Sequence, residues 1–433
     1  MKMIYNVSDK PKFGQVLVFA LQQLLAILAA TIAVPAIVGN GMSSSAALFG
    51  AGVGTIVYLL FTKFKSPVFL GSSFAFIGSM SAAFAGAATT AVGYLGLIIG
   101  AFFAGLVYVV IAIVVKFCGV AWVNKLMPPV VIGPTVAIIG LSLAGNAISD
   151  LQKGPNVYIG LICGLVTLFV TMICSVFGKK MMKMIPFIIG IAAGYIVATI
   201  ITLVGGDAYQ VIDFSKFNDM QWYPDFTFVT ALGGFSDITG AYIGTVAVAY
   251  VPVAFVVFAE HIADHKNLSS IIEKDLLVEP GLHRTLLGDG VGSMAGAFFG
   301  GCPNTTYGES VGCVAISGNA SVVTILATAL LAIIASFFAP FVTLLATIPG
   351  SVMGGVCIAL YGFIAVSGLK MIQDVDLNDN VNLFTVSVIL IAGIGGLTVN
   401  FGAVTITEVA CALILGIVTH KVLDRSNKKE EKK

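Results

Sequence analysis

The sequence predicts an all-α polytopic membrane protein with fourteen transmembrane segments in two inverted repeats of seven, and with short β-strands in segments 3 and 10. Three features support this fold class: a very apolar composition, a one-sided distribution of basic residues and an internal similarity between the two halves. Hydrophobic residues make up 58% of the 433 residues and charged residues only 10%, and the mean hydropathy is +1.03. A soluble chain carries roughly 25% charged residues, so lipid must solvate much of this one.

The composition also argues against several partners and cofactors. The net charge is +1, so no bulk attraction to nucleic acid is expected. The seven cysteines are scattered through apolar segments without a CxxC pair or a nearby histidine. Buried, inert thiols are therefore expected rather than disulfides or metal ligands. We expect no cofactor and no bound metal.

Apolar runs of membrane-spanning length, roughly 20 residues, follow one another along the chain. The first is too long for a signal peptide and no A-x-A-like site closes it before Pro35, so it is predicted to be a retained helix. Two later segments are short and rich in Ser, Thr and Gly. The predicted segments are 14–39, 45–62, 68–83, 90–115, 128–146, 156–177, 183–204, 239–262, 284–300, 303–317, 320–345, 349–369, 381–399 and 401–421.

The basic residues support this number of segments. Cytoplasmic loops hold most of the Lys and Arg of a membrane protein. With a cytoplasmic N-terminus and fourteen crossings, all of the 22 basic residues except Lys153 and Lys216 fall on the cytoplasmic side. The sequence therefore predicts a multi-pass protein of the plasma membrane with both termini in the cytoplasm. The longest external loop, 205–238, holds aromatic residues suited to the membrane interface.

The two halves of the chain resemble each other at a separation of roughly 220 residues. "AATIAVPAIVG" (29–39) matches "AVAYVPVAFVV" (247–257), and "PPVVIGPTVAIIGLSLAG" (128–145) matches "PGSVMGGVCIALYGFIAVSG" (349–368). The two short segments also correspond. Seven segments per half is an odd number, so the second half must run inverted. Inverted repeats with paired, interrupted segments are typical of secondary transporters, whose binding site lies where the interruptions meet. The alternative is chance similarity between glycine-rich helices.

Two glycine-rich stretches could be mistaken for nucleotide loops. "GAGVGT" (50–55) and "GDGVGSMAGAFFGG" (288–301) lack the strand–turn–helix context and the downstream acidic residue of such a loop. Glycine at this spacing lets membrane helices approach closely. We therefore predict a packing role for both.

Three acidic residues are the main candidates for function. Glu260 and Asp264 are one helical turn apart and share a face, and Glu309 follows the polar stretch "NTTYG" (304–308). A charge at the centre of a bilayer costs from ~2.5 to over 10 kcal/mol, so such residues face a cavity. The predicted segments 239–262 and 303–317 contain no Lys or Arg that could neutralise them. A proton could do so, or a ligand with N–H donors.

Other polar residues have plainer interpretations. Asp264 alternatively caps the helix end at the cytoplasmic surface. His261 points away from the face of Glu260 and is predicted to be structural. Asp289 and Glu408 lie near the starts of segments, where a carboxylate favours a helix N-terminus, and are also predicted to be structural.

The short segments predict an unusual backbone. "GSSFAF" (71–76) and "NTTYGE" (304–309) combine strand-favouring residues with flanking glycines. We expect each to form a short extended piece followed by a half-helix. The two pieces could pair with each other, and their N–H groups would then point at a ligand beside the carboxylate. Irregular backbone is tolerated at membrane depth only where protein or a water-filled cavity satisfies it.

Several motifs together resemble the bacterial uracil permeases of the nucleobase–ascorbate transporter family, from about residue 8 to 422. They are "GSSFAFI" (71–77), "AEH" (259–261), "KDLLVEPGLHRTLLGDG" (274–290), "PNTTYGE" (303–309) and "LYGFIAVSG" (360–368). The resemblance implies proton symport, a homodimer formed through the gate domain, and two domains between cytoplasmic ends. The implied boundaries are N-terminus 1–13, core 14–118 and 239–346, gate 119–238 and 347–422, and tail 423–433.

The resemblance also implies a binding site, position by position. Glu260 and Glu309 look like the pair that hydrogen-bonds the base, and Phe74 and Gly308 match positions whose main-chain amides contact it. The pocket walls would be Ala30, Tyr307 and Tyr361.

Two positions depart from the family pattern. The family's uracil members often have histidine where this chain has Asp264, and often have Asn where it has Ser310. The first departure bears on the proton pathway, in which Asp264 would act with Glu260 and Glu309. The second bears on base selectivity.

Proton-coupled uptake of uracil by alternating access is therefore the leading prediction. A xanthine or other purine symporter is the alternative within transport, although "YGESVG" (307–312) lacks the Gln-Asn pair of purine-transporting relatives. An anion carrier would need basic residues at the site. A membrane-embedded enzyme would need a nucleophile with a base or a metal cluster, and the four histidines form no such set. A channel gains nothing from a protonatable pocket of ligand size.

Overall fold

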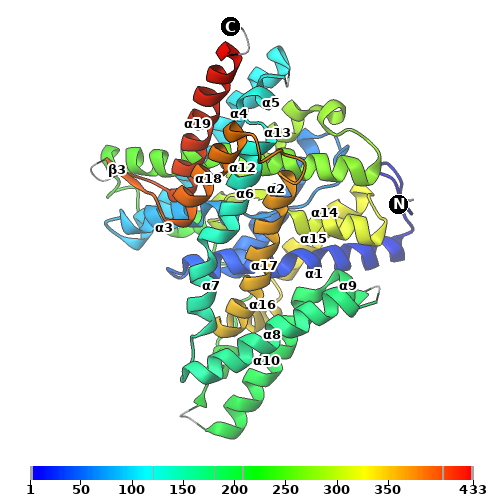
Figure 1. The fold of residues 1–433 in the computed structure, drawn as a ribbon. Coiled ribbons are helices and arrows are strands. Elements are labelled where there is room, and N and C mark those ends of the chain that lie inside the picture. The colour runs from blue at the N-terminus through cyan, green and yellow to red at the C-terminus, as the bar shows by residue number, and fades with distance from the viewer. Residues whose placement is uncertain (1–2, 120, 180, 207–208, 402–403, 431–433) are drawn as a thin grey trace.

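The computed structural model describes residues 3–119, 121–179, 181–206, 209–401 and 404–430, which are mostly helical (Figure 1). The first half contains α1 (Phe13–Val38), α2 (Ser44–Phe61), α3 (Ile77–Ala85), α4 (Thr90–Cys118), α5 (Ala121–Leu126), α6 (Pro129–Ser142), α7 (Ala144–Leu151), α8 (Val157–Phe177), α9 (Met181–Met184), α10 (Pro186–Gly205) and α11 (Thr227–Leu232). The second half contains α12 (Gly240–Ile272), α13 (Leu282–Gly300), α14 (Gly308–Ser317), α15 (Val322–Ser336), α16 (Ala339–Ala346), α17 (Gly350–Met371), α18 (Asn380–Ile394) and α19 (Glu408–Glu430).

Many of these helices are long and apolar enough to cross a membrane. In the described residues eight pass by length and composition, with α6 and α7 taken together, or nine if α15 and α16, which are bent by 82°, form one broken span. The count falls below fourteen partly because segments 68–83 and 303–317 are a strand plus a short helix, and because α18 has only 15 residues. The multi-pass architecture is confirmed, and fourteen crossings stay a prediction.

Two predicted segments differ from the elements of the structure. Segment 239–262 is part of a longer helix, because α12 keeps a buried face through Leu268 and Ile272 and ends only where Glu273 turns left-handed at φ 52°. Segment 401–421 begins instead with a hairpin of β3 (Val399–Phe401) and β4 (Val404–Ile406), whose β-branched and aromatic residues favour strands. The helix α19 then continues through the predicted polar tail to Glu430, and residues 431–433 of that tail lie outside the described residues.

The two short segments cross each other in the middle of the molecule, as predicted. β1 (Leu70–Ser72) pairs with β2 (Asn304–Thr306) in an antiparallel ladder with Gly71 opposite Thr305. Each strand leads directly into helix: β1 into the short 3₁₀ turn Phe74–Phe76 and α3, and β2 into α14. The two helical N-termini therefore start at the crossing.

Helices α2 and α13 pack against each other through glycine, as the sequence predicts. An added Cβ on Gly50 of α2 would lie 2.5 Å from the main-chain oxygen of Gly296, and one on Gly292 of α13 would lie 2.8 Å from that of Gly54. Asn304 at the start of β2 uses this close approach, because its Nδ2 donates to the main-chain oxygen of Gly50 at 3.0 Å. The seam thus joins the two halves of the chain and anchors one strand of the crossing.

The beginning of the chain pairs with the turn after α14. The amide of Ile4 donates to the oxygen of Gly318 at 2.7 Å, and the amide of Ala320 donates to the oxygen of Tyr5 at 2.9 Å. The hydroxyl of Ser321 donates to the oxygen of Asp9 at 2.6 Å. Residues 4–9 therefore form a strap across the end of α14.

An ion-pair cluster joins two connections that the sequence places on the same side of the membrane. Lys65, after α2, lies 2.6 Å from Glu279, and Lys274, after α12, lies 3.0 Å from it. The hydrogen bonds from Lys65 and Lys274 lower the pKa of Glu279 to about 2. All three side chains are exposed, so the cluster links the loops without adding much stability.

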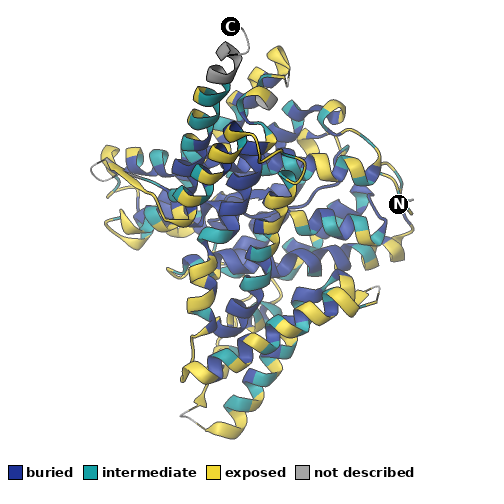
Figure 2. Cartoon of the chain, in the orientation of Figure 1, coloured by how far each residue is buried: buried dark blue, intermediate teal, exposed yellow. Residues whose placement is uncertain are grey.

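Burial is concentrated in the middle of the molecule, whereas α8 and α10 expose much of their surface (Figure 2). The exposed side chains of α8 are mostly large and apolar, among them Ile162, Phe169 and Val176. In a multi-pass protein such a surface suits contact with lipid tails.

The close packing of α2 and α13 through glycine predicts opposite changes in stability for two Gly→Ala substitutions. Gly292→Ala should destabilise the protein by about 1–3 kcal/mol, because the new Cβ meets backbone that cannot rotate away. Gly244→Ala is the matched control, because a Cβ there meets nothing within 4 Å, and alanine in a helix interior gains about 0.5–1 kcal/mol over glycine. Unfolding in mixed micelles titrated with denaturing detergent measures both. Equal effects at the two sites would contradict the seam.

Candidate functional site

A cavity of ≈ 300 Å³ lies beside the crossing of β1 and β2. Its size is at the lower end of the range for small-molecule sites. The lining residues come from strand β2, the turn before α3 and helices α1, α6, α8–α10, α12, α14 and α17. The lining residues are Ala26, Phe74, Val136, Ser175, Lys183, Met184, Pro186, Phe187, Glu260, Ala263, Asp264, Asn267, Thr305, Tyr307, Gly308, Glu309, Gly312, Cys313, Ile316, Phe363, Ile364 and Ser367.

All three predicted acidic residues line this cavity. Glu260 and Asp264 share a face of α12, and Glu309 enters from the second residue of α14. Asp264 lies inside α12, two turns before its end, so the alternative that it caps a helix end at the surface is wrong. The cavity thus brings together two acidic groups from α12 and one from α14, and all three belong to the second half of the chain.

Asp264 is held by the crossing itself. The hydroxyl of Thr306 in β2 donates to Oδ2 of Asp264 at 2.7 Å. Gly308, two residues later, lies so near that an added Cβ would be 3.9 Å from Oδ1 of Asp264. One carboxylate oxygen of Asp264 is therefore fixed, and the other lies beside the first residue of α14.

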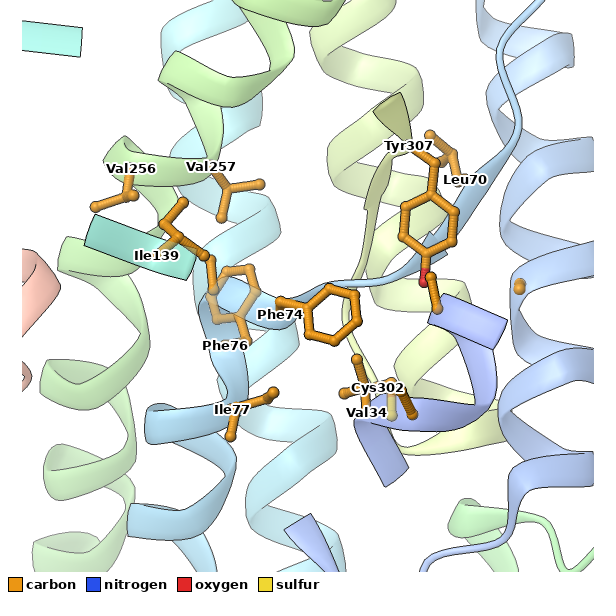
Figure 3. Packing of buried hydrophobic residues seen from close by; sticks show 14 of the residues in the cluster. Val34, Leu70, Phe74, Phe76, Ile77, Ile139, Val256, Val257, Cys302 and Tyr307 are labelled. Atoms are coloured by element: carbon orange, nitrogen blue, oxygen red, sulfur yellow. The ribbon is translucent and has the colours of Figure 1, made fainter. Parts of the chain in front are cut away.

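Two aromatic residues that the sequence singles out, Phe74 and Tyr307, line the cavity. The hydroxyl of Tyr307 donates to the main-chain oxygen of Ser72 at 2.8 Å, so its ring is fixed against β1. Figure 3 shows Phe74 nearer to Val34 and Cys302, while Phe76 points toward Ile139. Each aromatic ring is therefore held by the crossing or by the core.

The other two predicted wall residues do not reach the cavity in this structure. Ala30 is fully buried in α1, one turn beyond the lining residue Ala26. Tyr361 packs edge-on against Phe74, with 5.6 Å between ring centroids. Tyr361 therefore acts on the cavity through Phe74.

Ser310 does not line the cavity and instead connects three elements of the structure by hydrogen bonds. It is fully buried, and its Oγ accepts hydrogen bonds from Nε2 of Gln23 at 2.5 Å and from the amide of Phe69 at 3.2 Å. The residue after Glu309 thus ties α14 to α1 and to the chain entering β1. Gln23 was not expected from the sequence, because nothing in an apolar helix indicates which turn faces α14.

Behind α12 lies a second polar group, closed off from the cavity. His261 Nδ1 is 2.7 Å from Oδ2 of Asp289, and Nε2 is 2.9 Å from Oγ1 of Thr285. The Thr285 hydroxyl also lies 3.0 Å from the main-chain oxygen of Leu282. Both ring nitrogens of His261 are therefore engaged by buried polar groups.

This pair is structural, as the sequence predicts, although for a different reason. Asp289 is the eighth residue of α13 and is fully buried, so it pairs with His261 and does not serve a helix N-terminus. Glu408 is the first residue of α19, where the sequence places it. His265, stacked on His261 at 4.0 Å, contacts the hydroxyl of Tyr58 at 2.7 Å.

The cavity also contains residues that the sequence does not indicate. Lys183 comes from α9, far from the acidic residues in sequence, and Thr305 is a buried residue whose hydroxyl has no hydrogen-bond partner. Among the described residues no three His, Cys, Asp or Glu side chains are grouped so that they could hold a metal ion. The seven cysteines are free, and all except Cys118 are buried.

Substitutions of two neighbouring threonines test the hydrogen bond from Thr306 to Asp264. Thr306→Val should lower the free energy of unfolding by about 1–3 kcal/mol, because a largely buried carboxyl oxygen loses its donor. Thr305→Val should be neutral or stabilising, because the hydroxyl that it removes has no partner. Detergent-titrated unfolding of both variants is the measurement, and an equal loss in both would contradict the assignment.

Comparisons with known proteins find relatives along nearly the whole chain. The chain is 41% identical to the uracil permease of Bacillus caldolyticus over 98% of this chain and 95% of the relative. It is 37% identical to the uracil permease of Bacillus subtilis, covering 99% and 97%. It is 34% identical to the uracil permease of Escherichia coli, covering 95% and 92%. These relatives are transporters and not enzymes.

Solved structures show the same fold. The transmembrane domain of the cyanobacterial bicarbonate transporter BicA matches with a TM-score of 0.65 at 16% identity, covering 95% of this chain and 98% of that one. The murine Solute Carrier 26 family member A9 anion transporter, in its inward-facing state, matches with a TM-score of 0.65 at 14% identity, covering 97% and 70%. The model of the Permease family, Xan_ur_permease, matches residues 14–402, and the chain therefore belongs to this family.

Proposed function

We propose that this protein takes up uracil together with protons across the plasma membrane by alternating access. The observation that carries the proposal is the cavity in which Glu260, Asp264 and Glu309 meet beside the strand crossing. The names of the full-length relatives support uracil as the substrate. The proposed topology has fourteen segments, both termini in the cytoplasm, and a homodimer formed through the gate domain.

The chemistry of uracil matches the lining of the cavity. Uracil is planar and neutral, with two N–H donors and two carbonyl acceptors. Glu260 and Glu309 would accept from its N–H groups, since an ionised carboxylate only accepts. The main-chain amides of Phe74 and Gly308, at the two helical N-termini, would donate to its carbonyls. The rings of Phe74 and Tyr307 would cover its faces.

Proton coupling follows from the accumulation of acidic groups. Three carboxyl groups in one small cavity repel one another when ionised, so each favours a proton on its neighbours. Asp264 lies on the same face of α12 as Glu260 and one turn farther along, so we assign it the relay of protons to Glu260. In this scheme it replaces the histidine that the resemblance would place there.

The proposed architecture has two inverted repeats divided into core and gate domains. The correspondence between the two strand–helix units, β1 with α3 and β2 with α14, supports the repeats. The composition of the cavity lining supports the two domains, because residues from 119–238 and 347–422 line it together with residues from the core segments.

The alternatives fit the cavity less well. A purine symporter of the same family would use the same acidic groups, and competition by xanthine distinguishes it from a uracil carrier. An anion carrier on this fold would face three carboxyl groups. The histidine pair that an enzyme could use as a base is engaged with Asp289, Thr285 and Tyr58 away from the cavity.

Glu309→Gln should abolish uracil binding measured by calorimetry. The substitution replaces an acceptor-only carboxylate with a group whose donor end can face the base. Glu273→Gln, at the exposed end of α12, is the control and should bind as the wild type does. Unchanged affinity in the Glu309 variant would remove this residue from the site.

Uptake should be electrogenic. The base is neutral near pH 7, so a co-transported proton carries the only net charge, and 100 mV supplies ~2.3 kcal/mol per charge. At ~1.4 kcal/mol per tenfold, this supports roughly fortyfold accumulation. Vesicles held at zero pH gradient, with an inside-negative potential set by potassium and valinomycin, should concentrate labelled uracil. Equilibration that ignores the potential and uncouplers would identify a facilitator.

A further inference from the structure

Lys183 is a basic residue in a cavity otherwise dominated by acidic groups. It belongs to α9, the short helix between α8 and α10, and lines the same cavity as Glu260, Asp264 and Glu309. The described residues form ion pairs at Lys65, Lys153, Lys274 and His261, and Lys183 is in none of them. Its ammonium is therefore not held in an ion pair with any of the described residues.

The position of Lys183 is set by packing on both sides of it. Two residues before it, Sδ of Met181 accepts from Nε2 of Gln22 in α1 at 2.6 Å. One residue after it, Met184 packs with Ala26 of α1 and Cys313 of α14 in a small apolar cluster that is separate from the main core. Helix α9 is thus seated against the helix that begins with Gly308 and Glu309 (Figure 1).

We propose that Lys183 is the counter-charge that makes the cavity carboxyl groups release their protons on this side of the membrane. The other titratable groups that face the carboxyl groups are Tyr307 before α14 and Cys313 within it, both neutral when protonated. Behind α12, His261 and Asp289 are paired with each other and do not line the cavity. The lining residues from α1, α6, α8, α10 and α17 carry no charge, so Lys183 is the one cation among the described lining residues.

Lys183 and the three carboxyl groups line the same cavity of ≈ 300 Å³. A nearby cation favours the ionised form of a carboxyl group. Lys183 is exposed, so solvent and salt weaken the interaction.

In the transport cycle, Lys183 would favour proton release on one side of the membrane. This role rests on the proposed function. With Lys183 present, carboxyl groups that have lost their ligand give up their protons at lower pH on the side where α9 lies. The sequence shows no basic residue in the predicted segments 239–262 and 303–317, and the fold supplies one from another segment.

The test compares Lys183→Gln, Lys183→Arg and Lys179→Gln in the ligand-free protein. The carboxylic C=O infrared band is followed against pH, and Glu309→Gln and Asp264→Asn assign it. Lys183→Gln should move the midpoint upward by roughly 0.5–1.5 pH units, the scale expected when a carboxyl group loses one partly solvated cation nearby. Lys183→Arg should titrate as the wild type does. Lys179, an exposed residue that does not line the cavity, should leave the midpoint unchanged.

A Lys183→Gln curve that superimposes on the wild type would overturn the proposal, and so would an equal shift in Lys179→Gln, which would indicate a general surface effect. The infrared measurement needs no substrate, so it tests the role of Lys183 independently of transport. A wild-type protein that binds no uracil would refute the proposed function, and the infrared comparison would still decide the role of Lys183. Where uracil does bind, the pH dependence of its affinity should shift in the same direction in Lys183→Gln only.

Discussion

The site depends on one constraint: backbone that leaves a helix among membrane-spanning segments must find hydrogen bonds within the protein. Residues 70–72 and 304–306 satisfy this constraint by pairing with each other. The amide of Ser73 extends the pairing, because it donates to the oxygen of Pro303 at 2.9 Å. Because each strand then turns into a helix, two helical N-termini converge at one point. The cavity, the support of Asp264 by Thr306 and the placement of Glu309 all follow from this crossing.

The crossing also explains how side chains from distant parts of the chain are held together. Asn304 reaches α2 because glycines let α13 and α2 approach closely, and Ser310 connects α14 to α1 and to the start of β1. The carboxyl groups on α12 and α14 are therefore supported by α1, α2, α13 and the two paired strands. A fold shared with anion transporters can carry a different cargo, because the fold fixes where the N-termini meet and the side chains at that point decide what binds.

Local sequence signals predicted much of this arrangement. The cost of a buried charge singled out Glu260, Asp264 and Glu309, and Thr, Phe and Tyr between glycines indicated the paired strands. Contacts between distant segments could not be predicted where no sequence motif distinguishes the residues that meet. The packing of α1, α9 and β2 brings Gln23, Lys183 and Thr306 to the site. Packing also decides that Tyr361 contacts Phe74 and does not line the cavity. The hairpin at 399–406 was missed because its apolar residues also satisfy the length rule for a span.

The strap formed by residues 4–9 has a consequence for biosynthesis. Its partners, residues 318–322, are made more than 300 residues later, so the start of the chain must wait on its side of the membrane while most of the helices are inserted. The end of α14, and with it the half-helix that carries Glu309, can be secured only after that delay. The beginning of the chain and the turn after α14 must also lie on the same membrane face, which makes this contact an internal check on topology during assembly.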